Sequence, residues 1–280
     1  MLTRLLLVVA TTLGLTACGG GPAEVRMPEG VTVHIDQSRV LQKTRTVFLR
    51  LHNGSDQDLR VTRFVLSSPR FDDVVWTGDE RVEAPYDADL ELEMPRGRCG
   101  TGVDATVTLT YAVDGEERRS SLRPDDPYGA AARFLDRDCA ERTLDEAADV
   151  ELGDVTVVGE GGDSRLRLPV TITPTGERDD VVLRGFGDTV LFAQAEGSAV
   201  EIDRPVSGDP FTVDMVLRPA RCDAHVLAED KVGTLIPVEI AADGLPDGTS
   251  FYLPIGEARR SAFYDYYDQN CRLAGRGTYP

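Results

Sequence analysis

The stretch Leu90-Glu-Leu-Glu-Met-Pro-Arg-Gly-Arg-Cys99 decides the fold, because it returns 123 residues later as Val213-Asp-Met-Val-Leu-Arg-Pro-Ala-Arg-Cys222. In both copies apolar residues occupy every second position ahead of an Arg-Cys pair. Upstream, Val47-Phe-Leu-Arg-Leu51 and Val170-Thr-Ile-Thr-Pro174 stand at the same offset. Alternation with period two is typical of a half-buried β-strand. A repeat at fixed spacing indicates a duplicated unit, so we predict two modules of about 120 residues.

Strand patterns fill both halves of the chain, and turn signals such as Asn53-Gly and Asp114-Gly separate them. Short strands with frequent turns are typical of β-sandwiches. We therefore predict an all-β fold with two tandem immunoglobulin-like β-sandwich modules, each with a short C-terminal helix and one disulfide. The only tryptophan, Trp76, does not recur in the second half, so the predicted likeness is one of architecture. The expected strands are 31–35, 46–51, 59–66, 90–94, 106–113, 155–158, 166–173, 181–185, 190–193, 211–217, 234–241 and 250–253.

Each half ends in a helical pattern that closes on a cysteine. Asp126 is suited to cap the first helix, which we expect up to Cys139, with Phe134 facing a core. We expect the second helix at 256–270. Residues 140 to about 150 are polar and acidic, and we place the junction between the modules there. The predicted organisation is a signal peptide at 1–17, a lipidated Cys and tether at 18–28, and modules at 29–146 and 147–280.

Four cysteines remain after Cys18, and four cysteines allow three pairings. The repeat selects Cys99 with Cys139 and Cys222 with Cys271, one bond in each module. Free thiols or a zinc site are the alternative, but spacings of 40 and 49 residues are far from those of zinc ligands.

The first residues read as an export signal, with Arg4 ahead of an apolar run that is too short to span a bilayer. The run leads into Leu15-Thr-Ala-Cys18, and a Gly-rich tether follows. This stretch resembles the lipobox of bacterial lipoproteins; the alternative is an ordinary signal peptide with an incidental cysteine. The resemblance implies cleavage before Cys18, lipidation of Cys18 with diacylglycerol and a further acyl chain such as palmitate, and a membrane-anchored, extracytoplasmic protein.

The formal net charge of −18 argues against nucleic acid as a partner, because nucleic-acid binding depends on neutralising phosphates with cations. It also argues against electrostatic adhesion to anionic lipid headgroups.

The densest polar cluster is the loop Asp223–Asp230. Asp223, His225, Glu229 and Asp230 are a candidate set of ligands for zinc or manganese. A single histidine is a weak metal signal, so we favour a loop whose charges face solvent. The first module has no equivalent, and this asymmetry makes the loop our candidate for a ligand site. The loop is also loosely similar to exported lipoproteins of actinobacteria that have no assigned activity, which implies no function.

Three further groups are better explained by structure than by chemistry. Phe263, Tyr266 and Tyr267 share one helix face and are expected in the core, with Tyr264 exposed, although a binding platform is the alternative. Asp243 and Asp247 flank glycines and are expected in turns. His34 and His52 are expected in strands.

The sequence carries no nucleophile elbow, S-x-x-K motif or phosphate loop. We therefore predict a non-enzymatic binding or scaffolding lipoprotein of the cell envelope that needs no cofactor. Its expected partners are the membrane, through Cys18, and an envelope protein or the wall. The alternative is a small-ligand or metal-binding envelope protein that uses the Asp223–Asp230 loop, and a hydrolase ranks third.

Overall fold

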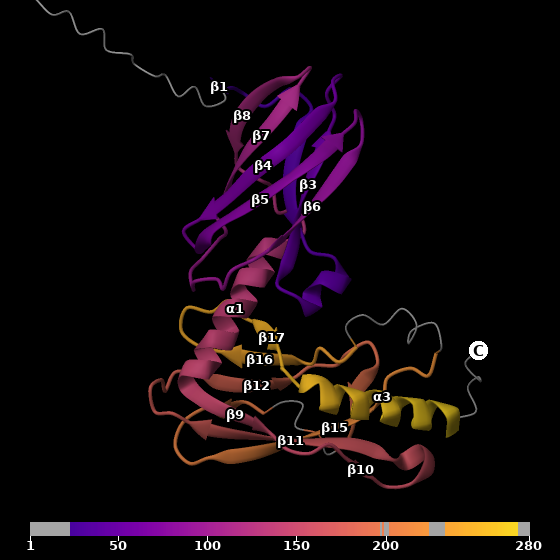
Figure 1. Ribbon diagram of the computed structural model, residues 1–280. Helices are drawn as coiled ribbons and strands as arrows, with labels where there is room; N and C mark the ends of the chain where they lie inside the picture. Colours follow the sequence, from indigo (N-terminus) through magenta and orange to yellow (C-terminus); the bar gives the residue numbers. More distant parts are fainter. Residues whose placement is uncertain (1–22, 197, 199–201, 224–232, 274–280) are drawn as a thin grey trace, which may run out of the picture.

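The computed structural model describes residues 23–196, 198, 202–223 and 233–273. These residues form two β-sandwich modules that stand end to end, with a long helix at their boundary (Figure 1). The predicted all-β fold of two tandem modules, each with a C-terminal helix and a disulfide, is confirmed.

The first module consists of a three-stranded sheet, in the order β2-β3-β6, packed against a five-stranded sheet, β1-β8-β7-β4-β5. All neighbours are antiparallel except β1, which pairs with β8 in parallel. A 3-10 helix, Arg39–Lys43, connects β2 and β3. The strands are β1 (Ala23–Glu24), β2 (Val31–Asp36), β3 (Thr46–Asn53), β4 (Leu59–Ser68), β5 (Phe71–Val82), β6 (Asp87–Glu93), β7 (Thr106–Val113) and β8 (Glu116–Leu122).

The second module has one sheet in the order β10-β11-β15-β13, with β9 also paired to β11, and a second sheet in the order β14-β12-β16-β17. A second 3-10 helix, Gly161–Asp163, precedes β11. The strands are β9 (Ala148–Leu152), β10 (Thr156–Val158), β11 (Arg165–Pro174), β12 (Val182–Phe186), β13 (Phe192–Gln194), β14 (Arg204–Pro205), β15 (Phe211–Pro219), β16 (Pro237–Ala241) and β17 (Ser250–Tyr252).

The two modules share one strand topology, in agreement with the sequence repeat. The order β2-β3-β6 recurs as β9-β11-β15, and β8-β7-β4-β5 recurs as β17-β16-β12-β14. The latter order matches the G-F-C-C′ sheet of immunoglobulin-like domains. Val47 pairs with Leu92, whereas its counterpart Val170 pairs with Val213. The register thus differs by two residues between the modules, and a shift of two keeps the same side chains facing the core.

Alternating burial along the strands builds the two cores. In β7, Val107, Leu109, Tyr111 and Val113 are buried while the residues between them are partly exposed. The predicted strand 234–241 is shorter, because β16 begins at Pro237. Strands β5 and β8 were not predicted, since their charged sequences show no apolar alternation.

Helix α1 (Ala130–Ala147) is longer than the helix we predicted up to Cys139. The helix also begins later than predicted, at Ala130 with Gly129 as its N-cap, although the Asp126 carboxylate does accept hydrogen bonds from the amides of Ala131 and Ala132 at 3.3 and 3.0 Å. The helix then continues into the polar stretch as far as Ala147, because Ala140, Leu144 and Ala147 recur on one buried face. Strand β9 follows without a linker and pairs with β11.

Helix α1 belongs to both cores, which makes it the element that joins the modules (Figure 1). Its first half packs Ala131, Phe134 and Leu135 into the core of the first module. Its second half packs Ala140, Leu144 and Ala147 into the core of the second module. Helix α3 (Gly256–Leu273) is the counterpart in the second module, where it covers the sandwich.

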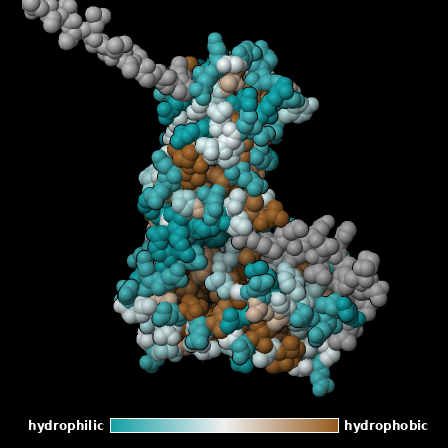
Figure 2. Space-filling model, in the orientation of Figure 1, coloured by the Kyte–Doolittle hydropathy of each residue, from teal (hydrophilic) through white to brown (hydrophobic). Residues whose placement is uncertain are grey.

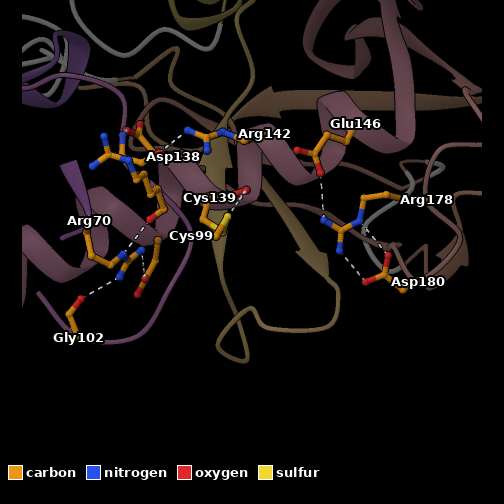
Figure 3. The surroundings of a disulfide bond; sticks show 12 residues. Arg70, Cys99, Gly102, Asp138, Cys139, Arg142, Glu146, Arg178 and Asp180 are labelled. Atoms are coloured by element: carbon orange, nitrogen blue, oxygen red, sulfur yellow. Dashed lines mark hydrogen bonds and ion pairs between the residues drawn. A yellow bond between two sulfur atoms is a disulfide. The ribbon is translucent and has the colours of Figure 1, made fainter. Parts of the chain in front are cut away.

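Both predicted disulfides are present. Cys99 bonds to Cys139, which fastens the connection after β6 to the middle of α1 (Figure 3). Cys222 bonds to Cys271, which fastens the segment after β15 to α3. Each bond therefore ties the C-terminal helix of a module to the corresponding point of its sandwich.

Candidate binding groove between the modules

The sequence-predicted ligand loop lies mostly outside the described residues. The structure describes Asp223, whose side chain is exposed, but not His225, Glu229 or Asp230. The predicted lipidation site, Cys18, also lies outside the described residues. Within the described residues, no three His, Cys, Asp or Glu side chains come together in a way that could hold a metal ion. The Asp223–Asp230 loop stays a prediction.

The aromatic cluster of α3 is part of the core, as predicted. Phe263, Tyr266 and Tyr267 are at most 2% exposed, and the Tyr266 hydroxyl donates to the Ser164 carbonyl at 2.9 Å. The rings of Phe263 and Tyr267 meet Phe192 edge-on. Tyr264, which we expected to be exposed, is half-buried, because the stripe of α3 that packs against the core is wide enough to include it.

The remaining predicted residues occupy the structural positions expected of them. Asp243 and Asp247 lie exposed in turns, and the Asp243 amide donates to Asp180 Oδ2 at 3.0 Å. His34 and His52 lie in β2 and β3. The Nδ1 atom of His52 is 2.7 Å from Asp87 Oδ1 on the neighbouring strand β6.

The structure adds a site that we did not predict, a groove of about 460 Å³ where α1 crosses β17. Its volume is in the range of small-molecule pockets, roughly 300–1,000 Å³. The molecular surface is mainly hydrophilic, and a recess with hydrophobic side chains opens beside the boundary of the modules (Figure 2). The first module contributes Gln42, Thr44, Arg45, Arg96, Phe134, Arg137, Asp138 and Glu141, and the second contributes Thr234, Leu235, residues 251–256 and Arg260.

One side of the groove is held by an ion pair between the half-buried Arg45 and the buried Asp138. Arg45 donates to both carboxylate oxygens of Asp138 at 2.8 and 2.6 Å, and also to the carbonyls of Met94 and Pro95. The Gly97 amide donates to Asp138 Oδ2 at 2.6 Å, next to the disulfide of Cys139 (Figure 3). Because every charge here has several partners, this network fixes the position of α1 against the first module.

A second network fixes α1 against the second module. Arg178 donates to Glu146 of α1 at 3.2 Å and to both oxygens of Asp180 at 2.9 and 2.7 Å (Figure 3). These contacts hold the pKa of Asp180 at about 2, with the Arg178 hydrogen bonds as the main cause. One network holds the middle of α1 and the other its C-terminal end, so α1 is fixed against both modules.

The positive charge of the groove exceeds its negative charge, in contrast to the chain as a whole. Its lining holds four arginines and two carboxylates, whereas the chain has 30 basic and 48 acidic residues. Asp138 is paired with Arg45, and Glu141 lies 3.9 Å from Arg96. Desolvation raises the pKa of Glu141 above its usual value.

Arg137 and Arg260 have no carboxylate partner among the described residues. The guanidinium of Arg137 instead lies over the ring of Tyr252, 4.8 Å from its centroid. The Tyr252 hydroxyl donates to Gln42 Oε1 at 3.4 Å, which links β17 to the first module a second time. The groove therefore presents two guanidinium groups that form no ion pair with a described carboxylate, and one of them is stacked on an aromatic ring.

No sequence signal could have found this groove. Its residues come from five separate stretches between Gln42 and Arg260, and they meet only because α1 brings the modules together. No described helix is both long and apolar enough to cross a membrane.

No family model matches the sequence, and no curated protein matches it. Among solved structures, red sea bream transglutaminase is similar at 12% identity with a TM-score of 0.24, and the match covers 80% of this chain and 30% of that one. The BSP domain of a biofilm associated protein is similar at 10% identity with a TM-score of 0.20, covering 86% of this chain and 61% of that one. The B domain of a biofilm associated protein gives 10% identity and a TM-score of 0.19, covering 83% and 87%. None of the three likenesses identifies a family or an activity.

Proposed function

We propose that this protein is a lipoprotein anchored through Cys18 at the extracytoplasmic face of the cell membrane. The Leu15-Thr-Ala-Cys18 stretch and the tether after it support the anchor. Two disulfides support a compartment outside the cytoplasm, because thiols are kept reduced inside most cells. Strand β1 pairs with β8 from Ala23 onward, only five residues beyond Cys18, so the first module would stand close to the membrane.

The protein acts there as a non-enzymatic binding unit, and its site is the groove between the modules. The observation that carries this proposal is the sharing of α1 by both cores, with Leu135 in one and Leu144 in the other. A groove between two loosely tethered domains would change shape continuously, whereas a groove built on one shared helix is pre-organised for a partner.

The anchor is tested by growing cells with radioactive palmitate, which is incorporated into acyl chains, and then separating the membrane fraction from the soluble fraction. The wild-type protein is expected in the membrane fraction with label, and Cys18→Ala is expected without label and outside that fraction. Label retained by Cys18→Ala would overturn the anchor.

The groove is tested in intact cells with a photo-crosslinking amino acid at one tyrosine position. Position 252 lies in the groove, and position 86 is a matched control, since Tyr86 is 64% exposed in the β5–β6 connection. We expect a defined crosslinked product from position 252 and none from position 86. Equal products from both positions, or none from position 252, would contradict a binding groove.

A further inference from the structure

We propose that the groove recognises an oxyanion, a carboxylate or phosphate group carried on a compact apolar body. This inference deepens the proposed function and rests on it. The occupant is defined by its chemistry: one negative head for the arginines and one apolar portion for the wall of β17.

The first observation is the state of Arg137. Its side chain is half-buried, forms no hydrogen bond or ion pair with a described residue, and lies over the Tyr252 ring. Burial lowers the pKa of Arg137 from its usual value, because desolvation penalises the charged guanidinium. An arginine stays protonated in proteins all the same. Asp138 attracts Arg137, but it is bound by Arg45 and forms no ion pair with Arg137. Because buried charges are normally paired, the half-buried Arg137 indicates where a further anion would bind.

The second observation is the helix end that faces the same groove. Gly256 lines it and is the first residue of α3, which is 18 residues long. Amides at a helix N-terminus carry partial positive charge and favour anions. Arg260 lies one turn further along α3, is exposed, and also lines the groove. Glu257 lies in the same first turn but is not part of the lining.

The third observation is the apolar part of the lining. Leu235, Tyr252 and Pro254 line the groove and are half-buried or exposed, so a ligand can contact their carbon atoms. Phe251, Leu253 and Ile255 support this surface from the core of the second module. Guanidinium groups bind carboxylate and phosphate with paired hydrogen bonds, and aliphatic groups pack on such a wall. A volume of about 460 Å³ suits a small organic acid or the end group of a larger molecule.

The test measures binding to the purified chain without its signal segment, by ligand-observed NMR and by the shift of the thermal unfolding midpoint. The probes are hexanoate, hexyl phosphate, inorganic phosphate and hexanol at constant ionic strength. We expect hexanoate or hexyl phosphate to bind, inorganic phosphate to bind less tightly, and hexanol not to bind. Binding of inorganic phosphate as tight as that of hexyl phosphate would overturn the role of the apolar wall.

Three variants locate the site. Arg137→Gln and Arg260→Gln are each expected to weaken binding about tenfold or more, since a charge-assisted hydrogen bond is lost. Arg137→Lys keeps the charge but not the paired geometry, and should fall between them and the wild type. Arg63→Gln is the control, because Arg63 is an exposed arginine on β4 outside the groove. Unfolding midpoints confirm that each variant folds.

Equal binding by wild type and Arg137→Gln, or hexanol binding as tightly as hexanoate, would overturn the proposal. Such a result leaves the proposed function standing if position 252 still crosslinks in cells, because a partner without an oxyanion would then occupy the groove.

Discussion

The guanidinium of Arg137 on α1 lies 4.8 Å from the ring centroid of Tyr252 on β17, and this contact crosses the boundary between the modules. A cation over an aromatic face contributes about 0.5–1 kcal/mol at exposed sites and more when desolvated. The contact therefore helps to hold the groove open in one shape while it leaves the arginine without a counter-ion.

A double-mutant cycle measures that contact. Arg137→Gln and Tyr252→Leu should each destabilise the protein, and the double variant should lose less than the sum, with a coupling of about 0.5–1 kcal/mol. Urea unfolding of the four proteins provides the free energies. A coupling of zero would show that the two side chains are neighbours without an energetic link.

The Cys99–Cys139 disulfide is expected to stabilise the first module strongly. In the chain-entropy description, closing a loop of 40 residues contributes about 4 kcal/mol. We expect the double substitution of both cysteines by alanine to lower the midpoint of urea unfolding, in one transition shared by both modules because α1 links their cores. The matched comparison is the Cys222–Cys271 pair, which closes a loop of similar length and should act in the same way. An unchanged midpoint would contradict the stabilising role of the bond.

Asp180 makes stability depend on pH in the acid range. Its folded pKa is lowered to about 2 by Arg178, below the value of about 3.9 for an unfolded aspartate. The stabilisation is thus complete above pH 4 and is lost as the pH falls through 2. Because a quarter of the side chain is exposed, we expect only about 1 kcal/mol.

Urea unfolding of the wild type and Asp180→Asn at pH 5 and at pH 2.5 tests this expectation. The wild type should be the more stable protein at pH 5, and the difference should shrink at pH 2.5. A difference that is independent of pH would rule out the ion pair with Arg178 as its cause.

The duplicated architecture could be predicted because it depends on patterns within short stretches. The alternation of Leu90, Leu92 and Met94 identified a strand, and the shared Arg-Cys placed both disulfides. Strand β8 was not predicted because its sequence, Glu116-Glu-Arg-Arg-Ser-Ser-Leu122, is charged and lacks apolar alternation. Its backbone hydrogen bonds to β7 hold it in the sheet.

The joint between the modules could not be predicted for a related reason. Glu141, Asp145 and Glu146 give residues 140–150 a polar composition, from which we placed the junction there without expecting a helix to run into it. The buried face of α1 there consists mainly of small residues such as Ala140 and Ala147, which carry little hydrophobic signal. The groove could not be predicted for the same reason, because Arg137 and Tyr252 are 115 positions apart and meet only where α1 packs on β17.

The central claim is that α1 makes the two modules one cooperative unit, and native-state hydrogen exchange tests it most directly. Leu135 and Leu144 are 0% and 2% exposed in the first and second core. Replacing a buried leucine by alanine costs about 2–5 kcal/mol. We predict that Leu144→Ala lowers amide protection along all of α1 and in β3 and β7 of the first module as well as in the second. Protection lost only in the second module, with the first module unchanged, would contradict the claim.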